Sequence, residues 1–309
     1  MKLEGIHHIT AITGDARGNV LFYVGTLGLR LVKKTVNQDD PTVYHLFYAD
    51  EHGSPGSDLT FFEYPDAVRG SPGAGMVHRI VWRVASERAI AYWERRLAAA
   101  GTETERVAGA LRFSDPEGLG HELVVASVDD EPLVGGAPDV PRELALQGFD
   151  AVRAYSLEPR RSERLLRDTL GFTGGRDGRW EVRGGQRGGL YVYDPAPEVR
   201  PRQGAGTVHH IAFASAMEDH EAWRERILAA GAHPTPVIDR FYFRSVYFRE
   251  PSGVLFEIAT IGPGFAADED REHLGERLSL PPDFEPLRDR LEQTLTALPN
   301  PHAGQEVKA

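Results

Sequence analysis

The chain has 309 residues, a length that predicts about two domains, and 41% of them are hydrophobic, enough for packed cores. It contains no cysteine, which excludes disulfides and thiolate-bound metals, so any metal must be held by His, Asp or Glu. The net charge of −11, from 35 basic and 46 acidic residues, makes nucleic acid an unsuitable partner.

The first predicted unit begins with a strand, GIHHITAIT, at residues 5–13. A predicted helix, NVLFYVGTLGL, follows at 19–29, and strand-like segments come next at 30–36, 42–49 and 58–64. The order is therefore strand, helix and three strands, a βαβββ unit.

Two later units resemble each other along their whole length. GMVHRIVWRV at 75–84 matches GTVHHIAFAS at 206–215, and the closing segments 113–125 and 248–260 both read as strand, Pro/Gly turn and strand. Between these segments each unit has a predicted helix with an apolar stripe and a glycine that suits the C-cap. The matching residues are Trp93, Leu97, Ala100 and Gly101 in one helix, and Trp223, Ile227, Ala230 and Gly231 in the other.

A more diverged unit lies between these two, with an opening strand at 149–157 and a helix at 160–172. The chain is thus predicted to be α+β, built from four βαβββ modules. The Pro/Gly/Asp-rich stretch 129–142 is the best domain boundary. We expect one pair of modules in 1–135, a second pair in 142–264 and an acidic helical tail in 265–309, where Leu287, Leu291, Leu295 and Leu298 have helical spacing.

A His-His pair occurs in two equivalent opening strands, as His7-His8 and as His209-His210. Neighbouring strand residues point to opposite faces, so only one histidine of each pair can face a given site. The faces that carry His8 and His210 also carry the small residues Thr10 and Ala212, which leave room for an ion. The opposite faces carry Ile9, Ile211 and Phe213 and suit packing against helices, so His8 and His210 are the expected ligands.

Glu257 lies within an apolar strand, VLFEIAT, where a carboxylate is costly unless it is paired or bound to a cation. It could pair with Arg244 or Arg249, but two histidines and one carboxylate also form the ligand set of non-haem Fe(II) oxygenases. Glu122 has the matching place in the second unit, where Arg79 replaces the histidine. We expect Glu122 to neutralise an arginine or to be solvated, without metal.

Several motifs carry a resemblance to a known family: GIHHIT, LFYVGTLGLRLVKKTVN, TVYHLFYAD, GTVHHIAF and an R-(x6)-Y-(x9)-E run that ends at Glu257. Across essentially its whole length the chain resembles the vicinal-oxygen-chelate superfamily of glyoxalases, bleomycin-resistance proteins and extradiol dioxygenases. Within that superfamily it looks like the hydroquinone-type ring-cleaving dioxygenases. The resemblance implies two glyoxalase-like curved-sheet barrels, each made of two modules.

By resemblance the metal ligands are His8, His210 and Glu257, and the residues around them are Thr10, His209, Arg240 and Tyr247. The turn REPSG folds its strand back so that Tyr247 lies nearly opposite Glu257. Arg240 and Tyr247 could stabilise an anionic oxygen, although one could be an ion-paired surface arginine and the other a core aromatic. His209 could move a proton, but strand alternation points it away from the ion, as it does His7.

The resemblance implies an Fe(II)-dependent enzyme that cleaves a hydroquinone- or catechol-type ring with O2, with Mn(II) or another divalent ion as an alternative. One rival is a glyoxalase-like metal-dependent isomerase or lyase with Glu63 as a fourth ligand. Another is a non-catalytic resistance protein that binds a small aromatic molecule or a drug. If one ion joins the ligands, the first and fourth units must pack together, and the middle two must pair.

No apolar run approaches the roughly 20 residues of a membrane span, and the N-terminus lacks a signal pattern. We therefore expect a cytoplasmic protein without a membrane partner. The oligomeric state is left open, with a homo-oligomer as one option.

Overall fold

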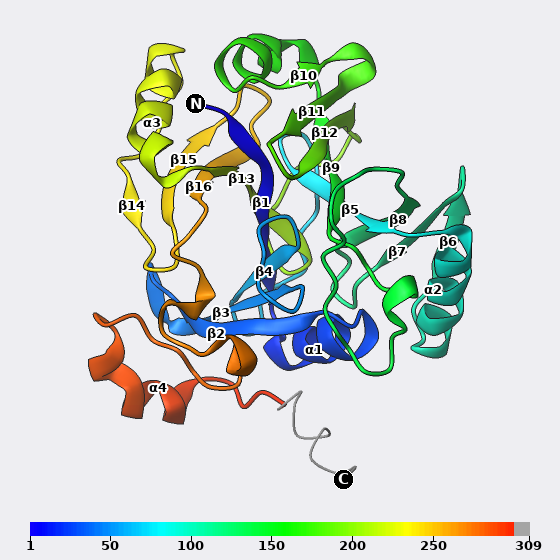
Figure 1. The fold of residues 1–309 in the computed structure, drawn as a ribbon, viewed down its shortest axis with the longest axis vertical. Coiled ribbons are helices and arrows are strands. Elements are labelled where there is room, and N and C mark those ends of the chain that lie inside the picture. The colour runs from blue at the N-terminus through cyan, green and yellow to red at the C-terminus, as the bar shows by residue number, and fades with distance from the viewer. Residues whose placement is uncertain (300–309) are drawn as a thin grey trace.

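The computed structural model describes residues 1–299, which form two curved sheets of eight strands each (Figure 1). The first sheet has the order β14-β15-β16-β13-β1-β4-β3-β2. Its strands are β1 (Leu3–Thr13), β2 (Arg30–Asn37), β3 (Asp40–Ala49), β4 (Asp58–Glu63), β13 (Thr207–Ser215), β14 (Ile238–Asp239), β15 (Arg244–Arg249) and β16 (Leu255–Thr260).

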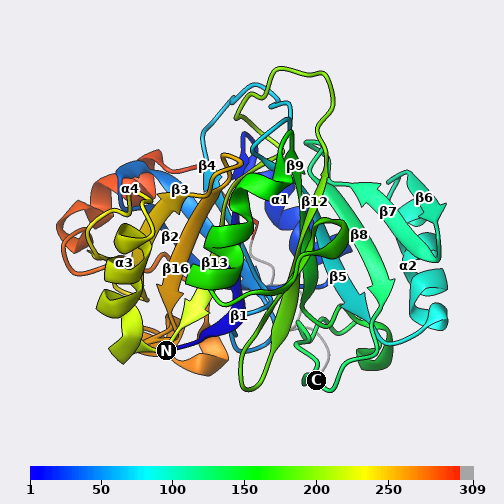
Figure 2. The ribbon, with the colours of Figure 1, turned by 90° about the horizontal axis from the view of Figure 1, so that it is seen from above.

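The second sheet has the order β10-β11-β12-β9-β5-β8-β7-β6. Its strands are β5 (Val77–Val84), β6 (Thr104–Val107), β7 (Ala110–Ser114), β8 (Gly120–Val125), β9 (Phe149–Ser156), β10 (Thr173–Gly174), β11 (Arg179–Arg183) and β12 (Gly188–Pro195). The two sheets lie next to each other, with β1 and β13 facing β9 and β12 near the centre of the molecule (Figure 2).

The first unit pairs with the fourth, and the second pairs with the third. β1 runs antiparallel to β13, and β5 runs antiparallel to β9. The predicted α+β fold, with paired modules in curved sheets, is confirmed. Each of the sequence segments 1–135 and 142–264 contributes one unit to each sheet, so the boundary at 129–142 separates halves of the sequence and not the two sheets.

The helices cover the outer sides of the sheets. α2 (Glu87–Ala99) and α3 (His220–Ala229) lie on opposite sides of the molecule (Figure 2). Each buries a tryptophan, Trp93 or Trp223, whose truncation to alanine would cost about 3–5 kcal/mol. Both helices are followed by a glycine with positive φ, as their sequences predict. The first unit has α1 (Ala16–Val20), continued by a π-helical turn at Leu21–Thr26, and the third has short helical turns at Pro159–Ser162 and Leu165–Thr169.

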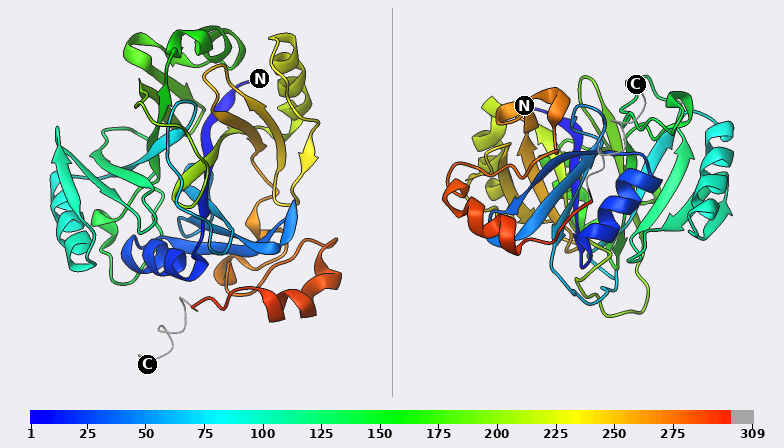
Figure 3. Two further views of the ribbon diagram at one scale, coloured as in Figure 1. Left: turned by 180° about the vertical axis from the view of Figure 1, so that it is seen from behind. Right: turned by 90° about the horizontal axis from the view of Figure 1, so that it is seen from below.

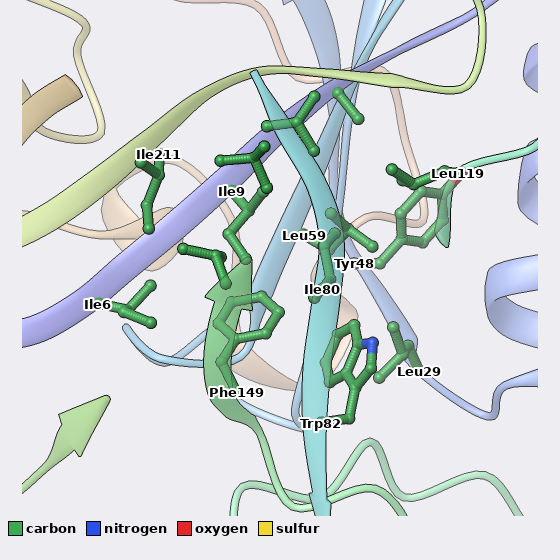
Figure 4. Close-up of a cluster of buried hydrophobic side chains, with 14 of the residues drawn as sticks. Ile6, Ile9, Leu29, Tyr48, Leu59, Ile80, Trp82, Leu119, Phe149 and Ile211 are labelled. Atoms are coloured by element: carbon green, nitrogen blue, oxygen red, sulfur yellow. The ribbon is translucent and has the colours of Figure 1, made fainter. Parts of the chain in front are cut away.

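The core between the sheets differs from the sequence expectation in one respect. Ile9 and Ile211 were expected to pack against helices, but they lie among residues of the second sheet such as Ile80 and Phe149 (Figure 4). The reason is the pairing of units, which places the outer faces of β1 and β13 against the other sheet. The opposite face of both strands, which carries His8 and His210, is therefore the inner face of the first curved sheet.

The tail after β16 is only partly helical. Short helical turns lie at Phe265–Ala267, Arg271–His273 and Glu285–Leu287, and α4 spans Arg288–Thr294. Leu295 already has an extended backbone. Leu295 and Leu298, which their spacing predicted to be helical, therefore lie outside α4.

The tail runs alongside β2, where the Ser279 amide donates to the Lys34 carbonyl at 2.9 Å (Figure 3). Residues 300–309, part of the predicted tail, lie outside the described residues. Within residues 1–299 no helix is long and apolar enough to cross a membrane.

Candidate metal centre

His8, His210 and Glu257 come from three adjacent strands of the first sheet, β1, β13 and β16. The Nε2 atoms of the two histidines lie 3.3 Å apart, and they lie 3.2 and 2.9 Å from Oε2 of Glu257. All three side chains are buried. The structure thus brings together the three residues that the sequence singled out, in a group that can hold a divalent metal ion.

The contacts of Glu257 have the lengths of hydrogen bonds without their geometry. Neither of its carboxylate oxygens has a hydrogen-bond partner within residues 1–299, although the residue is fully buried. A buried carboxylate is costly unless a cation compensates it. Ligand atoms that face a common point fit a metal ion, and two imidazoles with one carboxylate suit Fe(II), Mn(II) or Zn(II).

The electrostatics of the group favour a charged carboxylate. Burial alone would raise the pKa of Glu257, but the imidazoles of His8 and His210 outweigh burial and hold this pKa well below its usual value. Burial lowers the pKa of His210. Burial also acts to lower the pKa of His8, but the Glu257 charge reverses the direction and raises it. One anion and two nitrogen donors would leave a bound divalent ion with a net positive charge.

Strict strand alternation predicted that His7 and His209 point away from the site, but the structure places both beside the ligand histidines. The β1–β13 ladder skips His7 on one strand and His209 on the other, so each residue lies at a β-bulge. Their Nδ1 atoms lie 2.9 and 2.8 Å from Nδ1 of His8 and His210. Burial lowers the pKa of His7 to about 3 and that of His209 to about 4, so both imidazoles are neutral and can accept. Each can therefore orient the neighbouring ligand while Nε2 of that ligand faces the site.

Tyr247 and Arg240 lie on one side of the group. Tyr247 pairs with Glu257 in the β15–β16 ladder, as predicted, and its ring centroid is 5.5 Å from that of His210. The Arg240 guanidinium lies 5.7 Å from the Tyr247 ring and donates to both oxygens of Asp39 at 2.9 and 2.8 Å. Arg240 is thus ion-paired, one of the alternatives considered from sequence, but it also lines the cavity beside the histidines.

The fourth ligand proposed for a glyoxalase-like site is not in place. In the β13–β16 ladder Glu257 pairs with Ala212, which lies two residues after His210. Thr10 lies two residues after His8, and its partner in the β1–β4 ladder is Thr60. Thr60 therefore has the position equivalent to Glu257. Thr60 donates to Thr10 at 2.9 Å. Glu63 lies further along β4, accepts from Thr296 at 2.8 Å and does not belong to the metal-binding group.

A narrow cavity, partly open to solvent, adjoins the group. It is lined by aromatic side chains, namely Phe47, Phe62, Tyr242, Phe243 and Tyr247. His45 on β3 also lines the cavity and was missed from sequence, because a lone strand histidine is ordinarily structural. Asp58 was missed too: it pairs with His8 in the ladder, both its oxygens lack a partner within residues 1–299, and burial raises its pKa to about 8.

Comparison with known proteins identifies the family to which a chain with this site belongs. The model of the Glyoxalase/Bleomycin resistance protein/Dioxygenase superfamily matches residues 5–123 and 148–258. MhqO of Bacillus subtilis, provisionally named a ring-cleaving dioxygenase, is 42% identical over 95% of this chain and 96% of its own length. The chlorohydroquinone/hydroquinone 1,2-dioxygenase of Sphingobium indicum is 35% identical, again over 95% of this chain and 96% of its own.

Solved structures agree with these matches. A crystal structure of a provisionally assigned dioxygenase from Bacillus subtilis is 40% identical with a TM-score of 0.89, covering 96% of this chain and 98% of that one. Glyoxalase I from Zea mays, 14% identical with a TM-score of 0.57 over 88% of this chain and 96% of its own, shares the fold alone. The chain belongs to the glyoxalase/bleomycin resistance protein/dioxygenase superfamily, as its motifs predicted.

Proposed function

We propose that the protein is an Fe(II)-dependent dioxygenase that cleaves the ring of a hydroquinone-type aromatic diol. The observation that carries this proposal is the buried group of His8, His210 and Glu257, with Thr60 in the position where a fourth ligand would stand. A three-ligand site leaves coordination positions open for small molecules. The aromatic side chains that line the adjoining cavity suit an aromatic ligand.

The relatives support the reaction class and the substrate class. The Sphingobium indicum relative is named for chlorohydroquinone and hydroquinone, and it aligns over 96% of its own length. From that alignment and from the aromatic lining of the cavity, we infer that this protein also cleaves the ring of a para-diol. The ligand set suits both Fe(II) and Mn(II), and we favour Fe(II) because oxygenases with two histidines and one carboxylate use it.

When bound, the ion would supply Lewis acidity toward the substrate hydroxyl and the redox capacity that O2 chemistry needs. The protein would supply orientation and charge. Burial raises the pKa of the Tyr247 hydroxyl, which therefore stays protonated at neutral pH and can donate to an anionic oxygen. Arg240 adds a fixed positive charge on the same side of the cavity.

Oxygen consumption tests the proposal. Protein loaded with Fe(II) under anaerobic conditions and then mixed with air-saturated buffer should take up O2 only when hydroquinone is present, with a ring-opened acid as product. Loading with Zn(II) gives the matched control, since Zn(II) fills the same ligands without redox chemistry. An isomerase would show no uptake with any metal, and a binding protein would take up hydroquinone without product, so either result would reject the proposal.

A further inference from the structure

His45 has a position in the cavity that no role above explains. It projects from β3 and is partly buried. Its ring centroid lies 4.0 Å from that of Phe47 and 4.4 Å from that of Phe62, so two apolar rings fix the plane of the imidazole. A histidine held in this way presents a polar edge beside the aromatic part of the cavity wall.

The hydrogen bonds of His45 determine which nitrogen carries the proton. The Thr60 hydroxyl donates its only proton to Thr10, so its 2.9 Å contact with His45 Nε2 requires the imidazole to donate. Burial holds the pKa of His45 well below its usual value, so the ring is neutral and Nδ1 carries a lone pair. Within residues 1–299 the side-chain hydrogen bond of His45 involves Nε2, and the residue lines the cavity, so Nδ1 is left as an acceptor for a ligand there.

His45 lines the same cavity as His8 and His210 of the metal group. The Phe62 ring centroid lies 6.4 Å from that of His210 and 4.4 Å from that of His45. The Phe62 ring is thus near both His210 and His45 in the cavity wall. A para-diol has one hydroxyl at each end of a single ring and can reach two groups of one cavity, whereas an ortho-diol has both hydroxyls at one end.

We propose that His45 Nδ1 accepts a hydrogen bond from the distal hydroxyl of a para-diol whose other oxygen lies at the metal group, and so determines specificity for para- over ortho-diols. This role rests on the proposed function, since it presumes a diol at the group of His8, His210 and Glu257. One competing acceptor is Gln38, which also lines the cavity and whose amide nitrogen donates to the Arg240 carbonyl at 2.8 Å.

Anaerobic binding tests this role without turnover. The Fe(II)-loaded protein is titrated by calorimetry with hydroquinone, with phenol, which lacks the distal hydroxyl, and with catechol. Hydroquinone should bind the native protein about tenfold more tightly than phenol, the effect of one hydrogen bond to a desolvated acceptor. In His45→Phe, which keeps an aromatic wall, the ratio should fall to about one, while the catechol-to-phenol ratio stays unchanged.

The control variant is Gln38→Met, which removes the competing acceptor and should leave the tenfold ratio intact. Equal binding of hydroquinone and phenol to the native protein would overturn the proposal even if His45→Phe failed to fold. So would a ratio that survives in His45→Phe or disappears in Gln38→Met. Failure of O2 uptake would instead reject the ring-cleaving function, because the binding ratios do not depend on turnover.

Discussion

Both sheets bury a carboxylate at equivalent strand positions, but different groups compensate its negative charge. In the first sheet Glu257 faces two imidazoles, and in the second Glu122 accepts from Arg79 at 3.2 Å and from Arg112 at 2.7 Å. The prediction that Glu122 neutralises an arginine is confirmed. The ladders show that the two positions are equivalent, because Glu257 pairs with Ala212 and Tyr247 where Glu122 pairs with Val81 and Arg112.

The remaining positions explain why only one sheet can hold an ion. The counterpart of His210 is Arg79, and the counterpart of His8 is Ala151, which pairs with Val81 as His8 pairs with Ala212. Ala151 packs with Val81 and Val192 in an apolar cluster. A guanidinium fills the space beside the carboxylate, whereas a metal ion leaves coordination positions free. The comparison teaches that this strand position requires a cation, and that neighbouring residues decide whether the cation can take part in chemistry.

The largest expected effect comes from removing the two carboxylates in turn. Glu257→Gln should reduce metal affinity and O2 uptake by more than about 100-fold, because even partners outside the ligand set contribute about 10–100-fold. Glu122→Gln should leave both unchanged. It should lower the free energy of unfolding by about 1–3 kcal/mol, less than for a fully buried pair, because Arg79 and Arg112 are 23% and 29% exposed.

Metal analysis, O2 uptake and urea unfolding of the two variants check this prediction. Retained metal and activity in Glu257→Gln would contradict the site. Loss of metal in Glu122→Gln would show that Glu122 also affects metal binding, and that its only role is not the pairing with Arg79 and Arg112.

The residue opposite the carboxylate should have the next largest effect. Tyr247→Phe removes the hydroxyl that we propose as the donor to an anionic oxygen, so kcat should fall about 100-fold while metal content stays the same. Its counterpart variant Arg112→Met should leave kcat unchanged. Steady-state O2 uptake together with metal analysis separates a loss of chemistry from a loss of the ion. A Tyr247→Phe enzyme with native kcat would mean that Tyr247 only packs against His210.

The bulge histidines should have a smaller effect. His209→Ala removes the imidazole that contacts Nδ1 of His210, and metal affinity should fall about 10–100-fold. The equivalent bulge residue of the second sheet is His78, whose Nε2 contacts Asp194 at 2.8 Å. His78→Ala should therefore leave metal affinity unchanged. Competition with a chelator gives the affinities, and equal losses in both variants would show a general effect of the fold.

Sequence reasoning identified much of the first sheet because its signals are local or repeated. The repeat gave the four units, and strand alternation brought His8 and His210 to one face, where the structure has them. It failed for His7 and His209, because a bulge shifts alternation by one residue and leaves no mark in a single strand sequence.

Other features depended on contacts between distant segments. The position of Ile9 between the sheets follows from the pairing of units, which a strand sequence alone does not specify. The role of Thr60 becomes visible only when the β1–β4 and β13–β16 ladders are compared. The stretch 129–142 looked like a linker, yet the side chain of Asp130 is only 3% exposed and is held by arginines of the second sheet.

The smallest expected effect concerns those fixed charges of the second sheet and their pH dependence. Burial would raise the pKa of Asp130, but hydrogen bonds from Arg183, Arg83 and the Gly188 amide lower it to about 2. Because this pKa lies below the value of about 3.9 in an unfolded chain, the stabilisation is complete above about pH 4 and is lost as pH falls toward 2. Asp130→Asn should therefore lower the free energy of unfolding by about 1–3 kcal/mol at pH 7, and by clearly less at pH 3.

Urea unfolding at both pH values measures the difference, with metal content at pH 7 as the control for the first sheet. An equal loss at both pH values would mean that Asp130 stabilises through packing rather than charge. The contrast between the proposed metal ion of one sheet and the fixed charges of the other would then not extend to this residue.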